Sequence, residues 1–166
     1  MAGMNVIVRP ASPADVPPVW DMIRELAVYE RLLDTLSGTA ERLADLLFGP
    51  QHTLECLVAE EAGRLVGYAL FYPTYSSFRA RPGLWLEDLY VVPERRGSGA
   101  GKKLLTEVAR AAVARGSHRL DWNVLDWNEP AMEFYRRMGA GPTLPGWVQY
   151  GLDERSLRRL AESVEG

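Results

Sequence analysis

Residues 86–103 read LEDLYVVPERRGSGAGKK. They include most of a predicted strand at residues 84–92, which Pro93 ends. Glycine then occupies every second position, at Gly97, Gly99 and Gly101, ahead of an amphipathic helical stretch. Backbone N–H groups of such a loop turn toward one point, and the helix N-terminus adds positive potential. The stretch therefore predicts a cradle for phosphate, flanked by the cations Arg95, Arg96, Lys102 and Lys103.

The spacing of the loop argues against two common phosphate ligands. A Walker loop needs glycine where Arg96 stands and Ser or Thr where Lys103 stands. A dinucleotide loop, counted from Gly97 or Gly99, needs its last glycine where Lys102 or Leu104 stands. An isolated glycine-rich stretch would ordinarily be a solvated turn, but the order of strand, loop and helix favours binding.

Upstream of the loop, the pattern predicts a strand at residues 6–8 and a helix over 16–27. This helix can begin with a capping box at Ser12 or with Asp15 as N-cap. The second is favoured, because it places Pro17 and Pro18 at helical positions that need no N–H donor. A second helix is expected from Thr39 to about residue 47, then a hairpin of strands 54–60 and 65–72 and a loop through residues 82–83.

Downstream, apolar spacing predicts a helix over 104–113 that stops near Gly116, and then a strand at 120–124. Asn128 can cap the next helix, and Gly139 stands where a helix-ending glycine belongs. A last strand at 147–152 and a terminal helix at 157–161 complete the order. Strands and helices alternating in this way predict a mixed α/β sheet.

Composition bounds the class of protein. With 166 residues, 47% hydrophobic and 25% charged, the chain is expected to form one domain, 1–166, with a sizeable core. It shows no long apolar tract and no secretory leader, and a lone Cys56 cannot form an internal disulfide, so a cytoplasmic location without a membrane partner is expected. A net charge of -3 argues weakly against a nucleic-acid partner.

Short strings along the chain resemble one family. RGSGAG at 96–101 fits the R-x-x-G-x-G motif of the GNAT superfamily, which grips the pyrophosphate of acetyl-coenzyme A. RPA at 9–11, ELAVYE at 25–30, LEDLYV at 86–91, DWNEP at 126–130, FY at 134–135 and GW at 146–147 resemble the diamine (spermidine/spermine) N-acetyltransferase subfamily. The resemblance implies a GNAT fold, with a mixed, mostly antiparallel twisted sheet of about seven strands flanked by helices. It also implies acetyl-coenzyme A as co-substrate, a small amine substrate and a homodimer.

The resemblance implies residues for the co-substrate. The pantetheine would lie along the backbone of Leu89, Tyr90 and Val91. The pyrophosphate would be held by Arg96, Gly97, Ser98, Gly99, Ala100, Gly101 and Lys102. The other side of the co-substrate would meet Asn128, Glu129, Pro130 and Ala131, with Tyr135 near its sulfur.

Two side chains are candidates for catalysis. An alkylamine with a pKa of about 10.4 is neutral in only roughly one molecule in 2,500 at pH 7, a handicap of about 4.6 kcal/mol, so a base is needed. Glu87 is the candidate, as base or as holder of a water relay; strand alternation would turn Asp88 to the opposite face, and Asp88 is left unassigned. Tyr135 is the candidate acid for the departing thiolate, although a tyrosine beside Phe134 could equally be a packed aromatic.

The substrate side is less specific. The resemblance implies that Tyr29, Glu30, Glu87, Asp121 and Trp122 contact the amine, whereas packing is the alternative for Trp122. Pro145 stands where these relatives carry an acidic residue, which leaves the choice between a diamine or polyamine and a lysine-like amino acid open. Acetylation of a protein, or acyl-coenzyme A binding without turnover, are the other functions considered. His52 and His118 have no partner at metal-ligand spacing, so no metal is expected.

Overall fold

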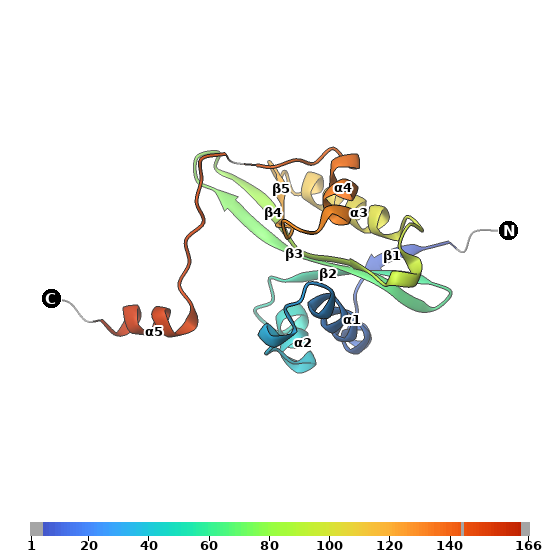
Figure 1. The fold of residues 1–166 in the computed structure, drawn as a ribbon, viewed down its shortest axis with the longest axis horizontal. Helices are drawn as coiled ribbons and strands as arrows, with labels where there is room; N and C mark the ends of the chain where they lie inside the picture. The colour runs from blue at the N-terminus through green and yellow to red at the C-terminus, as the bar shows by residue number, and fades with distance from the viewer. Residues whose placement is uncertain (1–4, 144, 164–166) are drawn as a thin grey trace. The chain divides into compact units, whose positions relative to one another are not determined.

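The computed structural model describes residues 5–143 and 145–163 (Figure 1). The chain falls into two compact units, one up to Asn128 and one from Glu129 onward. The first unit carries every strand of the described residues, and the second carries two helices.

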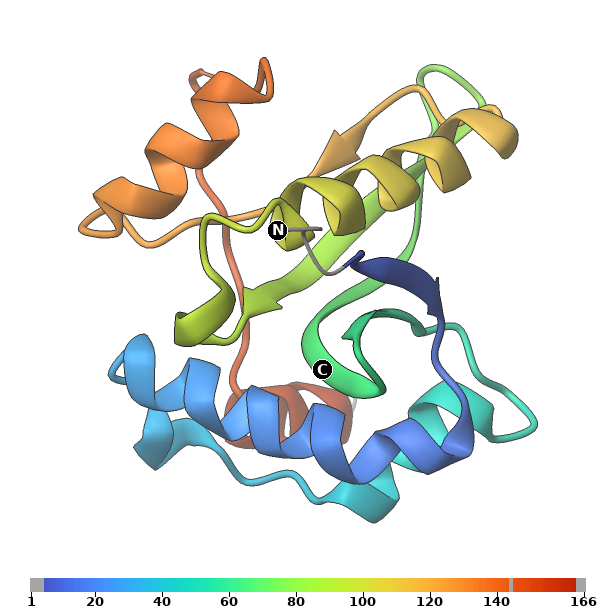
Figure 2. The same cartoon turned by 90° about the vertical axis from the view of Figure 1, so that its right-hand side faces the viewer.

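The first unit is a five-stranded sheet in chain order. Its strands are β1 (Ile7–Pro10), β2 (Glu55–Glu61), β3 (Arg64–Ser76), β4 (Arg81–Val91) and β5 (Leu120–Asp121). The first four pair antiparallel, and β5 pairs parallel to β4. Helices α1 (Val16–Tyr29) and α2 (Ala40–Phe48) cover one face of the sheet, and α3 (Ala100–Ala114) covers the other (Figure 2). The predicted mixed α/β sheet flanked by helices is confirmed.

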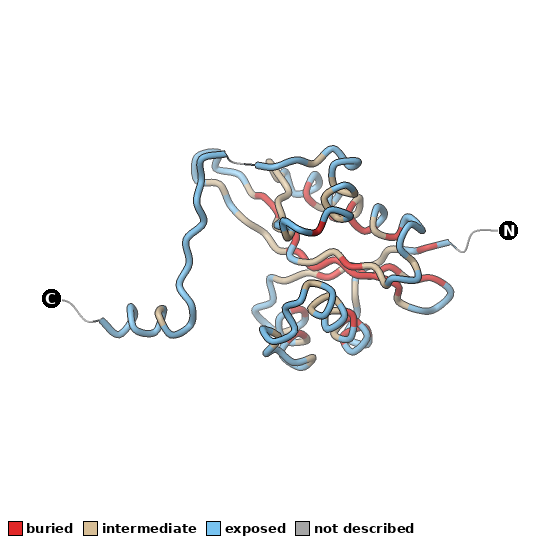
Figure 3. The backbone as a smooth tube through the Cα atoms, viewed as in Figure 1, coloured by how far each residue is buried: buried red, intermediate tan, exposed pale blue. Residues whose placement is uncertain are grey.

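The core lies on both faces of the central strands, where the buried residues gather (Figure 3). On the α1 and α2 face, alternate residues of β3 are buried against the helices, among them Tyr68 and Leu70. On the other face, Leu104 and Val108 of α3 are fully buried. Alternation along strands and a 3.6-residue repeat along helices are what sort these side chains.

The start of α1 combines both predicted caps. Residues Pro13–Asp15 form a 3-10 turn, in which the Ser12 N–H and hydroxyl donate to Asp15 Oδ2 at 2.7 and 2.9 Å. The α-helix itself begins at Val16 with Asp15 as N-cap, as favoured from the sequence. Arg9 donates to the same carboxylate at 2.7 Å and lowers the pKa of Asp15. Because the helix begins at Val16, Pro17 and Pro18 lie in its first turn, where a backbone N–H has no helix carbonyl to bond.

Two predictions about the strands are wrong. The sheet has five strands rather than about seven, and the predicted strand at residues 147–152 pairs with no strand in the described structure. The expected loop at residues 82–83 is also strand, since the β3–β4 hairpin continues to the pair Ser76–Arg81. Strand identity depends on a hydrogen-bonded neighbour, which local composition does not encode.

The second unit contains α4 (Glu129–Arg137) and α5 (Glu154–Glu162). Gly139 follows α4 with φ of 86°, as expected for a helix-ending glycine. Asp153 caps α5 by accepting from the Ser156 N–H at 2.7 Å. Among the described residues, no helix has the length and apolar character needed to cross a membrane.

Candidate functional site

The glycine loop has the geometry of an anion cradle. Gly97 and Gly99 have φ of 79° and 90°, a region that suits glycine, and Gly99 is the N-cap of α3. A Cβ added at either glycine would meet nothing within 4 Å, so open space adjoins the backbone there. The N–H groups of Gly101 and Lys102 lie in the first helical turn, where a helix offers them no carbonyl. These residues fit a pyrophosphate group.

The cations around the loop are not equivalent. Arg95 pairs with Glu61 at 2.6 Å, and Lys103 donates to the Val6 carbonyl at 2.8 Å, so both stabilise the fold. Arg96 donates to the Val91 carbonyl at 3.2 Å. Its guanidinium also lies over the rings of Tyr29 and Tyr90, at 4.9 and 5.7 Å from their centroids. Arg96 thereby links the loop to the end of β4 and the end of α1.

Replacing Gly99 by Val is expected to weaken acetyl-coenzyme A binding by at least tenfold, because valine disfavours positive φ and its side chain would enter the space beside the loop. Isothermal titration calorimetry measures the affinity. Gly116→Val is the matched control: Gly116 follows the other end of α3, has φ of 69°, and a Cβ added there would likewise meet nothing within 4 Å. Equal losses of affinity in the two folded variants would contradict the cradle assignment.

A β-bulge shapes β4 next to the loop. Leu70 of β3 pairs with Asp88, but the next residue, Phe71, pairs with Leu86, so Glu87 is an extra residue in β4. Two consecutive residues of a bulged strand oppose one residue of its neighbour. The bulge therefore interrupts the alternation that was expected to separate Glu87 from Asp88.

The contacts of the two carboxylates show that this expectation is wrong. Asp88 Oδ2 accepts from the Tyr68 hydroxyl at 3.2 Å, whereas the charge and hydrogen bond of Glu87 act on Tyr72. Tyr68 and Tyr72 are four residues apart on the regular strand β3, so they share one face. Glu87 and Asp88 are both on the α1 face of the sheet.

The carboxyl of Asp88 has a raised pKa. It is half-buried, and burial raises the pKa of its carboxyl to about 7, assisted by the nearby negative charges of Glu87 and Glu30. The hydrogen bond from Tyr68 acts the other way and lowers that pKa. A carboxyl of this kind exchanges a proton near neutral pH.

Glu87 is exposed and has aromatic neighbours. Trp85 Nε1 donates to Glu87 Oε2 at 3.1 Å, and Tyr72 is paired with Trp85 across the two strands. Sequence reasoning missed Tyr68, Tyr72 and Trp85. Tyr68 and Tyr72 are four residues apart on β3, and Trp85 is two residues before Glu87 on β4. Because side chains two or four residues apart on a strand share a face, this spacing could have identified them from the sequence.

The end of α1 brings the predicted amine-site pair to the same region. The Tyr29 hydroxyl donates to Asn128 Oδ1 at 3.2 Å, and Asn128 is buried. Glu30 is half-buried, and burial raises the pKa of its carboxyl. Because the charge of Glu30 also raises the pKa of Asp88, the helix end and the bulge form one acidic surface.

Other predicted site residues have structural contacts. Asp121 in β5 is paired in register with Trp85 and forms an ion pair with Arg119 at 2.6 Å. Trp122, next along the chain, is half-buried. Arg119 therefore already balances the charge of Asp121.

The remaining candidates lie in the second unit, on α4. Glu129, Pro130 and Ala131 form its first turn, and Glu129 pairs with Arg136 at 2.7 Å. Tyr135 is half-buried, with its ring edge-on to Phe134 at 5.3 Å between centroids. The structure brings together the first-unit candidates; the roles of Tyr135 and its neighbours stay predictions.

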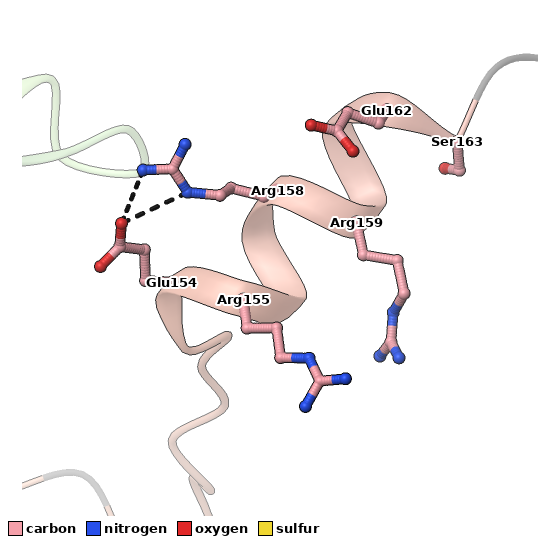
Figure 4. Close-up of a pocket in the computed structure, with 6 residues that line it drawn as sticks. All are labelled: Glu154, Arg155, Arg158, Arg159, Glu162 and Ser163. Atoms are coloured by element: carbon pink, nitrogen blue, oxygen red, sulfur yellow. Dashed lines mark hydrogen bonds and ion pairs between the residues drawn. The ribbon is translucent and has the colours of Figure 1, made fainter.

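One hollow of the surface contains none of the predicted site residues. It is lined by side chains of α5 and the following Ser163, with an exposed Glu154–Arg158 ion pair at 2.6 Å (Figure 4). An exposed pair one turn apart on a helix is an ordinary surface feature. Within the described residues, no three His, Cys, Asp or Glu side chains are grouped to hold a metal ion.

A glycine loop with the geometry of an anion cradle lies at the N-terminus of α3, beside a bulged strand that carries two carboxylates, and this arrangement fits an α/β protein that binds a phosphate-bearing coenzyme. The model of the Acetyltransferase (GNAT) family matches residues 20–140. Thialysine N-epsilon-acetyltransferase of Sus scrofa is 36% identical over 95% of this chain and 98% of its own. Spermidine/spermine N(1)-acetyltransferase-like protein 1 of Homo sapiens is 34% identical over 93% of this chain and 23% of its own.

A comparison with solved structures finds proteins of similar fold. An integron cassette protein from the mobile metagenome of V.cholerae matches with a TM-score of 0.78 at 24% identity, over 97% of this chain and 100% of its own. The chain belongs to the GNAT family of acetyltransferases. It is therefore an acetyl-coenzyme A-dependent N-acetyltransferase. The predicted resemblance to the diamine N-acetyltransferase group is confirmed.

Proposed function

We propose that the substrate is a small molecule with at least two charged groups, either a diamine or polyamine or a lysine-like amino acid. The observation that carries the proposal is the acidic surface formed by Glu30, Glu87 and Asp88, with Trp85 and Tyr72 beside Glu87. Carboxylates attract ammonium groups, and aromatic faces add cation–π attraction. The names of the relatives, which mention thialysine and spermidine/spermine, point in the same direction.

In the proposed reaction, the glycine loop and Arg96 hold the pyrophosphate and the backbone of residues 89–91 orients the pantetheine. Acetyl-coenzyme A supplies the thioester carbon that the amine attacks. Glu87 accepts the ammonium proton or holds a water that does so, and Tyr135 gives a proton to the departing sulfur. Tyr29, Glu30, Asp121 and Trp122 are proposed to line the amine side, and residues 128–131 the other side of the co-substrate.

A panel of amines tests the substrate class. We expect kcat/KM to be at least tenfold higher for spermidine, 1,3-diaminopropane or lysine than for propylamine, because a monoamine leaves part of the acidic surface unpaired. Release of the free thiol with a colorimetric reagent measures the rate. Propylamine as the best substrate would contradict the proposal. A clear preference for lysine over both polyamine-type amines would select the amino-acid class.

Acetylation of a protein terminus or lysine is the second candidate function. Glu30 and Asp88 are half-buried, so an amine that binds them loses part of its water. This favours a small substrate over a protein. A non-catalytic acyl-coenzyme A sensor would need the cradle alone. Thiol release that depends on a small amine supports the enzyme, and binding without release supports the sensor.

We further propose that both compact units belong to one catalytic domain and that the enzyme works in the cytoplasm as a homodimer, without metal, membrane or nucleic-acid partners. Support for the dimer comes from large apolar side chains that are exposed between α4 and α5. They are Trp147, Val148, Tyr150 and Leu152, with exposures of 74%, 76%, 92% and 53%. A second copy would remove such side chains from water.

A further inference from the structure

We propose that Asp88 is the group that finally accepts the proton lost by the substrate ammonium, and that Glu87 tunes and feeds it. This inference rests on the proposed function, since it assigns a proton acceptor within the same amine site. It departs from the sequence expectation, in which Glu87 alone is the base. The bulge is its structural basis, because it turns two consecutive carboxylates to one face.

The surroundings of Asp88 suit a proton acceptor. The groups that face it are Glu87 on its own strand, Tyr68 on β3, Cys56 on β2 and Glu30 after α1. Burial raises the pKa of Cys56 to about 12 and raises the pKa of Tyr68 well above its ordinary value, so both stay neutral. The charges that act on Asp88 are therefore those of Glu87 and Glu30.

The same surroundings bring the pKa of Asp88 close to neutral pH. A carboxyl with an ordinary pKa near 4 is a weak base for an ammonium, whereas burial and two negative neighbours raise the pKa of Asp88 to about 7. Proton transfer is most effective when the pKa of the base lies near the working pH. Glu87 is exposed, which suits the first encounter with the cation rather than storage of its proton.

The proton balance is complete within the site. One N–H bond of the ammonium breaks, its electron pair stays on nitrogen, and the proton binds a carboxylate oxygen of Asp88, directly or through Glu87 and water. The neutral nitrogen then forms the C–N bond as the C–S bond breaks. Nitrogen loses a second proton as the amide forms, and sulfur gains one, so the net proton leaves from Asp88 to solvent.

The test is the pH dependence of kcat/KM, measured with the best of the four amines above. We expect the wild-type rate to rise through an apparent pKa near 7, and Asp88→Asn to abolish that rise and lower kcat/KM at pH 7 by roughly 10²-fold or more. Glu87→Gln should move the rise to lower pH, because it removes a charge that raises the pKa of Asp88. Tyr68→Phe should move it to higher pH, because it removes the hydrogen bond that lowers this pKa.

Opposite shifts from two neighbours are a readout that a merely structural role would not produce. Glu55→Gln is the control, since Glu55 lies in the same sheet but pairs with Arg115, and its profile should match the wild type. If Glu87→Gln abolishes the rise while Asp88→Asn keeps it, Glu87 is the base and the inference is wrong. If the wild-type protein releases no thiol with any of the four amines, the proposed function itself fails.

Discussion

Tyr135→Phe is expected to lower turnover by roughly 10²–10⁴-fold while leaving acetyl-coenzyme A affinity within about twofold of the wild type. The substitution removes only a hydroxyl. A phenol with a pKa near 10 and a thiol near 8.5 are close enough for proton transfer along a hydrogen bond, so the hydroxyl is what the departing sulfur needs. Thiol release measures turnover, and calorimetry measures the affinity.

The competing account of Tyr135 is packing against Phe134, for which the edge-on contact is the observation. A packed tyrosine changed to Phe would keep near-normal turnover, and any harm would appear as a lower melting temperature. Tyr75→Phe is the matched control, because Tyr75 is 80% exposed and has no proposed role. Turnover of Tyr135→Phe equal to that of Tyr75→Phe would remove the acid role.

Asp88→Asn is expected to stabilise the folded protein at pH 8 by roughly 2–4 kcal/mol, even though it impairs catalysis. The pKa of Asp88 is raised from its ordinary value near 4 to about 7, which corresponds to at most about 4 kcal/mol when the group is fully charged. Solvent that reaches a half-buried group reduces this figure. If Asp88 is the proposed proton acceptor, its function opposes stability.

The sign of the effect defines the pH window. Because the folded state binds this proton more tightly than the unfolded state, stability falls as pH rises from about 4 to about 7 and stays low above it. Asparagine carries no such penalty, so the variant and the wild type should differ little at pH 4 and most at pH 8. Urea unfolding at pH 4 and at pH 8 measures the free energy of unfolding of both proteins. Asp21→Asn is the control, because Asp21 is exposed. A variant less stable than the wild type at pH 8 would contradict the assignment.

Local chemistry was enough for much of the fold. The α1 cap at Asp15, the Thr39 start of α2 and the glycine after α4 follow from short-range hydrogen bonds and backbone preferences, which neighbouring residues decide. The conformation of the glycine loop was predictable for the same reason, since Gly97 and Gly99 adopt positive φ between a strand and a helix. Predictions failed where a partner strand was needed, at residues 147–152 and in the extended β3–β4 hairpin.

The sequence by itself determined the glycine loop before a helix, the mixed sheet and the presence of Glu30, Glu87 and Tyr135 as candidates, because each depends on residue type and near spacing. Only the tertiary structure decided that Glu87 and Asp88 share a face. That outcome depends on one extra residue in β4 relative to β3, which no periodicity within β4 reveals. The tertiary structure also brings Glu30, more than fifty residues upstream, close enough to raise the pKa of Asp88. Burial and charge act through space, so the carboxyl whose pKa is raised to about 7 is the one that strand alternation had left unassigned.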